Sequence, residues 1–298
     1  MNDLISEEIR GYLNRIIING DLYNFSKIPS NGLASGKIGL AYFLFLYRDL
    51  FDEDYSELIE LIIETVCKEV NISLDSDNFG DGLAGVAWAL NQFISNHVSI
   101  SPGASLSNSL DSKFLNALGI EPTLFKHNPA SLDIQRLLEK RSLLQLSIHD
   151  GLLGYGIYLI SRLRSGTPFE NKYHILMTKE AIIKIIDEVY RTVTAQKCDL
   201  DSFFVLDPMN YLELKLFLSI SSATKVYDFK INQINSIISH YRYIAIKGSD
   251  SLPNYQNSIE DANNIFWWNS LKYKRIGPNL LPLFDSSFSR QLYQSDIS

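Results

Sequence analysis

Two aspartates and a histidine lie next to glycines that begin apolar segments of this 298-residue chain. Asp81 precedes Gly82, Asp150 precedes Gly151, and His149 comes directly before Asp150. A carboxylate at such a position suits the N-cap of a helix, because its oxygen can accept a hydrogen bond from the first free backbone N–H groups. We therefore interpret both aspartates first as helix caps. His149 is the histidine best placed for binding or acid–base chemistry, since it alone stands at the head of such a segment.

The other side chains that could do chemistry carry weaker signals. Trp88 and Tyr155 fall at helical spacing within apolar segments, which predicts core packing. Adjacent tryptophans on one short helix cannot both face the same core. The Trp267–Trp268 pair therefore predicts that one ring, for which we take Trp268, faces a cavity or a partner. The remaining histidines fall in loops or on amphipathic segments, so we expect them to be solvated or to cap helices: His97, His127, His174 and His240.

The glycines belong to an internal repeat. Three segments superimpose without gaps and share the pattern small or acidic residue, Gly, x, x, Gly, x, Ala or Gly, x, x, Leu: 35–44, 81–90 and 150–159. Their leading glycines, Gly36, Gly82 and Gly151, are far enough apart for each repeat to hold a glycine-headed helix, a turn and a second helix. The small residues leave one face of each glycine-headed helix bare, which predicts close approach of backbones. The sequence thus predicts repeated helical hairpins.

Helical periodicity extends along most of the chain. Some segments are apolar nearly all round, which predicts helices buried on most faces: 38–50, 83–93 and 152–163. Others carry an apolar stripe opposite a polar face, which predicts surface helices: 55–70, 182–193 and 234–241. Strand signals are scarce, so we predict an all-α fold in a single domain over residues 1–298, with further hairpins in 166–298. Periodicity fails in the serine-rich stretch 95–112, where Pro102-Gly103 indicates a turn, and we expect a long loop there.

Composition limits the classes of function. Hydrophobic residues make up 46% of the chain and charged residues 20%, so it can bury a large core. The 27 basic residues are outnumbered by 34 acidic ones and form no dense cluster, which argues against nucleic acid or an anionic membrane as a partner. No run approaches the roughly 18 apolar residues of a membrane span, and the first residues lack the apolar core of a signal peptide. We expect a cytoplasmic protein.

The glycine-rich segments carry a family resemblance. GLASGKIGLAYFLFLY, GDGLAGVAWAL and HDGLLGYGIYLI resemble the inner-helix repeats of the lanthionine synthetase C-like (LanC-like) proteins. The resemblance covers about residues 30 to 165, and it is specific as a set of three rather than in any one segment. It implies an α/α toroid (barrel) of concentric helical hairpins and a link to the modification of ribosomal peptides.

The zinc-binding motifs of the LanC cyclases are absent from the chain. Those enzymes resemble one another in a Trp-Cys-x-Gly repeat and a Cys-His-Gly repeat, whose metal activates a cysteine thiol of the precursor peptide. Here the only cysteines are Cys67 and Cys198, and the nearest counterpart of the His-Gly pair is His149-Asp150-Gly151, in which the histidine is displaced by one place. The position that the resemblance assigns to the catalytic acid holds Ser147. Without soft ligands for Zn²⁺, we expect a catalytically inert homologue with no metal and no cofactor.

Equivalent positions of stacked hairpins fall on the same rim of a toroid, so the heads of the repeats should converge. We predict a common ligand-binding cleft there, in which helix dipoles favour an anionic or amide ligand. Its candidate residues are Ser35, Asp81, Ser147, His149, Asp150 and, from the C-terminal region, Trp268. No catalytic role is assigned, although His149, Asp150 and Asp81 are the candidates for one. The expected function is binding of a precursor or leader peptide, as an accessory of a modification enzyme.

Two alternatives remain open. α/α barrels also serve carbohydrate-active enzymes, in which paired carboxylates such as Asp81 and Asp150 act as general acid and base. The chain could instead be a structural subunit whose toroid is completed by a partner. Capping explains the aspartates more simply than catalysis does, so peptide binding is the leading hypothesis.

Overall fold

The protein is all-α over the part of the chain that can be described. The computed structural model describes residues 28, 30–34, 36–47, 55–70, 75–95, 101–120, 137–138, 143–165, 169, 172–206 and 208–241. All regular secondary structure in these ranges is helical, and no strand occurs among them. This confirms the fold class that the periodicity predicts.

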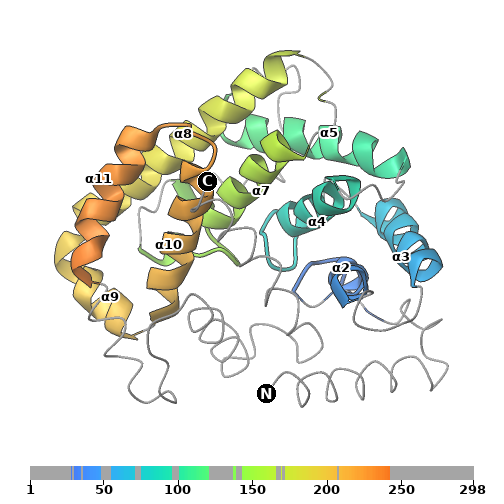
Figure 1. Ribbon diagram of the computed structural model, residues 1–298, viewed down its shortest axis with the longest axis horizontal. Coiled ribbons are helices and arrows are strands. Elements are labelled where there is room, and N and C mark those ends of the chain that lie inside the picture. Colours follow the sequence, from blue (N-terminus) through green and yellow to red (C-terminus); the bar gives the residue numbers. More distant parts are fainter. Residues whose placement is uncertain are drawn as a thin grey trace.

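The long helices pair into consecutive hairpins that form two layers (Figure 1). The first helix of each hairpin lies in an inner layer: α2 (Lys37–Tyr47), α4 (Leu83–Ser95), α7 (Leu152–Arg164) and α10 (Pro208–Ser222). The second lies in an outer layer: α3 (Ser56–Glu69), α5 (Ser101–Ala117), α8 (Lys172–Ala195) and α11 (Asp228–Ile238). Shorter elements join them: η3 (Leu143–Gln145), η4 (Lys197–Asp199), α9 (Leu200–Leu206) and η5 (Ser239–Tyr241).

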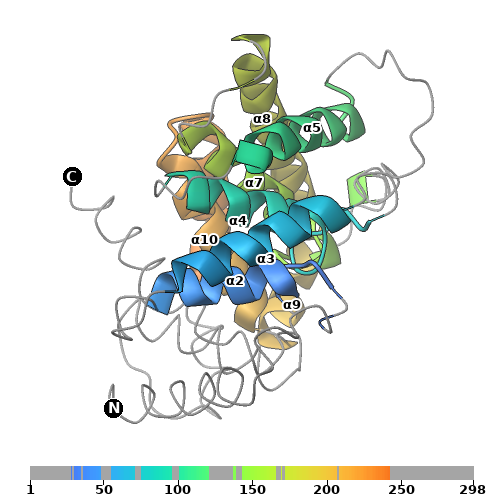
Figure 2. The same cartoon turned by 90° about the vertical axis from the view of Figure 1, so that its right-hand side faces the viewer.

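Neighbouring hairpins pack side by side along an arc. Within the inner layer α2 contacts α4, α4 contacts α7, and α7 contacts α10. The outer layer follows the same order, from α3 to α5, α8 and α11. Figure 2 shows α2 and α3 of the first hairpin lying against each other when the arc is seen from its side.

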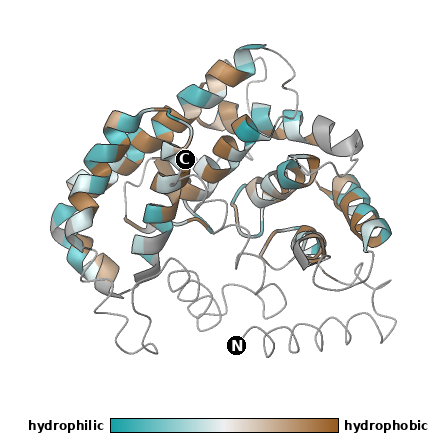
Figure 3. Cartoon of the chain, viewed as in Figure 1, coloured by the Kyte–Doolittle hydropathy of each residue, from teal (hydrophilic) through white to brown (hydrophobic). Residues whose placement is uncertain are grey.

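Burial explains the two layers. Inner helix α4 buries every residue from Leu83 to Asn91, and α7 buries every residue from Leu152 to Arg162, as their all-round apolar composition predicts. Outer helix α3 buries only the stripe formed by Ile59, Ile62, Ile63 and Val66. Figure 3 shows the mixed character of the outer helices, where hydrophilic and hydrophobic residues alternate along α8. Inner helices therefore form the core, and outer helices shield it from water.

The prediction of a long loop over 95–112 is wrong, because α5 begins at Ser101. Pro102 falls in the first turn of this helix, where the backbone N–H that proline lacks would have no partner inside the helix. Leu110 and Phe114, one turn apart, are fully buried. Tertiary burial of one helix face thus outweighs the weak helix propensity of the serines.

A buried polar network fixes α5 against α7. Tyr158 Oη donates a hydrogen bond to Asp111 Oδ1 (2.5 Å), and Arg162 Nε donates to Asp111 Oδ2 (2.7 Å). Arg162 Nη2 also donates to Asn108 Oδ1 (2.8 Å). Burial raises the pKa of Asp111, although the nearby guanidinium of Arg162 opposes this shift. The charged groups of this network pair with each other away from water, so it is a structural element that positions α5.

His174 also departs from prediction. The sequence predicts a solvated or helix-capping histidine, but only 2% of His174 is exposed. It lies on α8 one turn before Thr178, and both residues belong to the buried stripe that continues to Ile182. The buried stripe of α8 starts with two polar residues, His174 and Thr178, before it reaches the isoleucines. A search for apolar residues at helical spacing does not detect this polar part of the stripe.

None of the helices in the described ranges is long and apolar enough to cross a membrane.

Candidate ligand-binding site at the repeat heads

The segments directly before α2, α4 and α7 have the same backbone arrangement, and we call them the first, second and third repeat heads. They comprise residues 30–34 with 36, residues 76–82 and residues 145–151. In the first head Lys37 N–H donates to Ser30 O (2.9 Å), and in the second Leu83 N–H donates to the equivalent carbonyl, Ser76 O (2.8 Å). Each of these heads thus folds back over the start of its own inner helix and satisfies an N–H group there.

Adjacent heads are joined by the same pair of hydrogen bonds. Leu33 N–H and Ala34 N–H both donate to Gly80 O, at 2.9 and 2.7 Å. One repeat further on, Phe79 N–H and Gly80 N–H both donate to His149 O, at 3.1 and 2.9 Å. These donors and acceptors occupy equivalent positions relative to the leading glycines. The three heads are therefore linked in series through their backbones.

The second glycine of each motif allows the inner helices to approach the preceding head. A Cβ added at Gly85 would lie 2.9 Å from Leu33 Cβ, and one added at Gly154 would lie 2.4 Å from Phe79 Cβ. Leu33 and Phe79 hold equivalent positions in the first and second heads. The nearest backbone atoms belong to each helix's own head, at 2.0 Å from a Cβ at Gly85 (Phe79 O) and 2.2 Å from one at Gly154 (Ile148 O). Both glycines therefore leave room for a backbone carbonyl as well as for a side chain of the preceding head.

The junction between the third head and α10 is different, because α10 has no glycine head. Here Ile148 N–H donates to the carboxylate oxygen Oε2 of Glu213 on α10, at 2.8 Å. Ile148 is the equivalent of Leu33 and Phe79, which donate to backbone carbonyls. A glutamate side chain therefore takes the place of the acceptor that a fourth head would supply.

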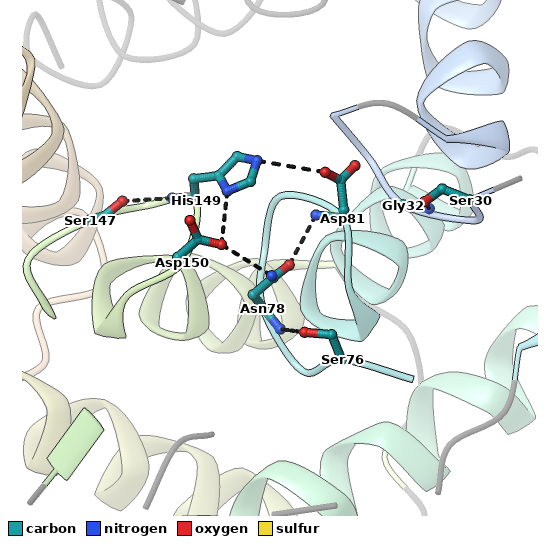
Figure 4. Close-up of polar contacts among 8 residues, drawn as sticks. All are labelled: Ser30, Gly32, Ser76, Asn78, Asp81, Ser147, His149 and Asp150. Carbon is teal, nitrogen blue, oxygen red and sulfur yellow. Dashed lines mark hydrogen bonds and ion pairs between the residues drawn. The ribbon is translucent and has the colours of Figure 1, made fainter. Parts of the chain in front are cut away.

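His149 lies between two aspartates that come from different repeats (Figure 4). Its Nδ1 atom is 3.0 Å from Asp150 Oδ1, and its Nε2 atom is 3.9 Å from Asp81 Oδ2. The imidazole lies against the backbone of Gly80, where an added Cβ would come within 2.1 Å of Nε2. The side chains are 25% exposed for His149, 39% for Asp81 and 70% for Asp150, so the group can be reached from solvent.

The charges around His149 favour its protonated form. Burial lowers the pKa of His149, but the hydrogen bond and charge of Asp150 raise it. The charges of Asp81 and Glu213 raise it further, so the pKa lies above its ordinary value of 6.5. Three carboxylates around one imidazole keep this region negative even when His149 is protonated. The arrangement suits a ligand that offers cationic or N–H donor groups.

This charge distribution argues against the anionic ligand that helix dipoles alone predict. The first N–H groups of α4 are already taken, since Leu83 and Ala84 donate to Ser76 O and Asp77 O. An anion at this rim would meet Asp81 and Asp150 instead of free backbone donors. The sequence analysis also names an amide ligand, and the N–H groups of an amide can donate to the carboxylates at this rim.

Asn78 is a site residue that the sequence analysis missed. Its Nδ2 donates to Asp150 Oδ1 (3.1 Å), and its Oδ1 accepts from Asp81 N–H (2.9 Å), so it links the two aspartates. Asn78 holds the same position in the second head as Ser147 holds in the third, four residues before the leading glycine. An alignment of the two heads therefore identifies Asn78 as a candidate once Ser147 is one. Ser147 has a related role, because its Oγ accepts from His149 N–H (3.2 Å).

The second head is also held in place by the outer helix α5. Lys113 on α5 forms an ion pair with Asp77, with 2.5 Å between Nζ and Oδ1, and both side chains are almost fully buried. This pair ties the head that carries Asp81 to the outer layer. A buried pair of this kind fixes geometry more than it adds stability.

The structure brings Asp81, Ser147, His149 and Asp150 into one neighbourhood, as the alignment of the repeats predicts. Ser35 and Trp268, the other two predicted residues, lie outside the described residues, as does Trp267. Trp88 and Tyr155 are buried core residues, as predicted.

The capping prediction for Asp150 is wrong. The N-cap residue of α7 is Gly151, and no side chain caps this helix. Asp81 lies at the equivalent place, two residues before the first residue of α4. Asp150 therefore stands one residue too early to cap α7, because the leading glycine takes the cap position, and Asp81 has the equivalent position before α4. Their carboxylates face His149 instead.

The residues at the heads do not fit the zinc site that the family resemblance implies. The two ring nitrogens of His149 face different carboxylates, so the three side chains do not point toward one common position. No group of three or more His, Cys, Asp or Glu in the described ranges is arranged to hold a metal ion. Cys67 is a free, half-buried thiol on α3. The metal content of the protein stays a prediction.

Comparison with known protein families, curated proteins and solved structures gives no significant match.

Proposed function

We propose that the chain is a LanC-like α/α toroid that binds peptide at the repeat heads and does not use zinc. In this proposal it serves as an accessory component in the modification of ribosomal peptides, where it holds a precursor or leader peptide. The glycine-headed inner helices, the two-layered arc and the serial linkage of the heads support the scaffold. A closed ring would need the parts of the chain outside the described ranges.

The observation that carries the binding proposal is the position of His149 between Asp81 and Asp150. A peptide presents backbone N–H groups, an amino terminus and lysine or arginine side chains. All of these donate hydrogen bonds to carboxylates, and the charged ones gain from the negative surroundings. In the described part of the chain Nε2 of His149 is buried and forms no hydrogen bond, so the two carboxylates, and not the imidazole, are the groups that a peptide would contact.

The arrangement does not favour the carbohydrate-active alternative. General acid–base hydrolysis of a sugar needs two carboxyl groups on either side of an open space that the glycosidic bond can enter. Asp81 and Asp150 instead approach the two nitrogens of one imidazole ring. A ligand at this rim would meet a histidine between the two acids, and recognition explains this arrangement better than hydrolysis does.

Peptide binding can be tested by fluorescence anisotropy with the full chain. The probe is a short labelled peptide with a free amino terminus and two lysines, compared with the same peptide fully acetylated. We expect Asp81→Asn/Asp150→Asn to weaken binding of the lysine peptide at least about tenfold, which is the loss of one charge-assisted hydrogen bond.

The matched control is Glu57→Gln/Glu60→Gln, which removes the same charge from exposed positions on α3. If the control and the site variant weaken binding equally, the effect is one of net charge and the proposed site is wrong. Hydrolysis of an oligosaccharide that is lost in Asp81→Asn would instead favour the carbohydrate-active alternative.

Zinc analysis tests the other half of the proposal. We expect the purified chain to carry no stoichiometric zinc, because its heads lack soft ligands at the required geometry. About one tightly held zinc ion per chain would contradict the loss of the metal site.

A further inference from the structure

A second surface feature lies at the far end of α7. An open groove of about 380 Å³ is lined by Leu163, Arg164, Ile175, Lys179, Ala223, Thr224 and Val226. These residues come from the end of α7, the first turns of α8 and the turn between α10 and α11, which passes beside α8 in Figure 1. Helix α7 has 13 residues, so the groove and the repeat heads are about 20 Å apart along it.

The lining of the groove combines apolar side chains with positive charge. Leu163, Ile175, Ala223 and Val226 supply apolar surface, and none of the lining residues is acidic. Arg164 and Lys179 are exposed, and neither forms an ion pair with a carboxylate in the described part of the chain. The protein has a net charge of −7, so two unpaired cations beside an apolar surface stand out against its overall charge.

Arg164 has a structural explanation that Lys179 lacks. It lies in the last turn of α7, where a cation complements the helix dipole. Lys179 is two turns into α8, beyond the reach of the dipole at that helix's N-terminal end. Ile175 is one turn before Lys179 on the same helix face and is 40% exposed.

The turn that forms one wall of the groove is strained and firmly held. Lys225 and Tyr227 both have a left-handed backbone, with φ values of 54° and 68°, although neither is glycine. Tyr227 Oη donates to Asp187 Oδ1 on α8 at 3.0 Å, and Thr224 Oγ1 accepts from Val226 N–H at 3.2 Å. These contacts fix the turn and keep Val226 on the groove side. Strained backbone that the surrounding structure maintains is typical of binding surfaces.

We infer that this groove binds an acidic peptide segment with interspersed apolar side chains. Carboxylates of the segment would pair with Lys179 and Arg164, and its apolar side chains would pack on Ile175, Leu163 and Val226. Complementary charge on a partly apolar groove gives both steering and affinity to such a partner. The site is separate from the repeat heads, and its carboxylate-binding character is the opposite of theirs.

The test uses the full chain and two labelled helical peptides, one of alternating glutamate and leucine blocks and one in which glutamine replaces every glutamate. We expect the glutamate peptide to bind in anisotropy titrations and the glutamine peptide to bind at least about tenfold more weakly. Lys179→Glu and Ile175→Ser should each weaken binding of the glutamate peptide at least about fivefold.

Matched controls lie elsewhere on the protein. Leu61 on α3 is 44% exposed, close to the exposure of Ile175, so Leu61→Ser removes a similar apolar surface. Lys197→Glu makes the same charge change as Lys179→Glu at an exposed position in η4. Both control variants should bind the glutamate peptide like the parent.

Three results would overturn the inference. The first is that the glutamate peptide shows no binding, and the second is that both peptides bind with equal affinity. The third is that Lys179→Glu and Ile175→Ser bind the glutamate peptide as tightly as their control variants do. Concentration-dependent dimerisation that Ile175→Ser abolishes would show that a second copy of the chain covers the groove instead. None of these outcomes bears on lysine-peptide binding at the repeat heads, since Asp81→Asn/Asp150→Asn tests that site separately.

Discussion

The junction between the second and third repeat heads differs from the one between the third head and α10. At the first, two backbone N–H groups converge on the carbonyl of His149, and Gly154 lets α7 pack against Phe79. At the second, the carboxylate of Glu213 accepts the hydrogen bond from Ile148. The regular junction is thus made by backbone acceptors, whereas the irregular one uses a side-chain acceptor. Both need small residues, since a Cβ added at Gly156 on α7 would lie 2.4 Å from Phe217 Cε2 on α10.

This difference has a chemical consequence. A backbone carbonyl carries no net charge, but Glu213 brings a full negative charge next to His149 and helps to raise its pKa. The junction that departs from the repeat is therefore the one that adds charge beside His149 and raises its pKa. Regular repeats build the scaffold, and the residue that replaces a missing repeat alters the electrostatics.

The largest expected effect comes from breaking the regular junction with Gly154→Leu. Even a Cβ at this position would lie 2.2 Å from Ile148 O and 2.4 Å from Phe79 Cβ, so backbone would have to move. We expect the free energy of unfolding to fall by about 3 kcal/mol or more, measured by urea denaturation. Gly154→Ala keeps the test interpretable if the leucine variant does not fold.

Gly119→Ala is the control for this prediction. Gly119 has a φ of 68°, but an added Cβ would meet only Lys184 Nζ at 3.7 Å. Its substitution should therefore cost only the strain of a left-handed residue, about 1 kcal/mol. If Gly154→Leu melts within about 2 °C of the parent, the close-packed junction is wrong.

The next effect concerns the irregular junction. Glu213→Ala removes the acceptor of Ile148 N–H, and we expect a loss of about 1–3 kcal/mol in the free energy of unfolding. Glu213→Gln keeps an oxygen acceptor without the charge and should lose less than about 1 kcal/mol. Equal losses in both variants would mean that the charge, and not the acceptor, supports the junction.

A smaller effect is expected at the aspartates, where the structure changes the prediction from sequence. As a helix cap, Asp81 would contribute about 1 kcal/mol. As an exposed partner of His149 at 3.9 Å, its ion pair should contribute less than about 0.5 kcal/mol, so Asp81→Ala should cost less stability than the loss of a cap. Asp150→Ala should be more costly, because Asp150 accepts from both His149 and Asn78. The opposite order in thermal unfolding would restore the capping interpretation.

The smallest effect is the pH dependence of stability that His149 contributes. Its pKa is raised in the folded protein, so the proton binds the folded state more tightly than the unfolded one. This stabilisation is fully present below the unfolded value of about 6.5 and disappears as pH rises through the higher folded value. The difference in unfolding free energy between the parent and His149→Gln should therefore shrink as pH rises from about 6 to 9.

An NMR titration of the His149 ring measures the same pKa directly. Asp150→Asn should lower it, because the hydrogen bond to a carboxylate and its charge are lost together. Glu213→Gln should lower it by less. A pKa of His149 at or below about 6.5 in the parent would show that burial outweighs the carboxylates.

The sequence alone determined the helical class, the hairpin repeat and the layer to which most helices belong. These follow from local rules: apolar residues spaced for one helix face or all faces, and glycines where a Cβ has no room. The same alignment of glycines also placed Asp81, His149 and Asp150 near one another, because equivalent residues of stacked repeats share a rim.

Tertiary structure decided the features that depend on partners far away in sequence. Asp150 does not cap α7, because Gly151 occupies the cap position and His149 attracts the carboxylate. The serine-rich stretch becomes α5, because Leu110 and Phe114 find a core and Asp111 finds Arg162. Glu213 carries no sequence signal that links it to Ile148, and only the packing of α10 against α7 brings the two together. Hydrogen bonds and charges between distant segments are set by the assembled fold, and local periodicity does not encode them.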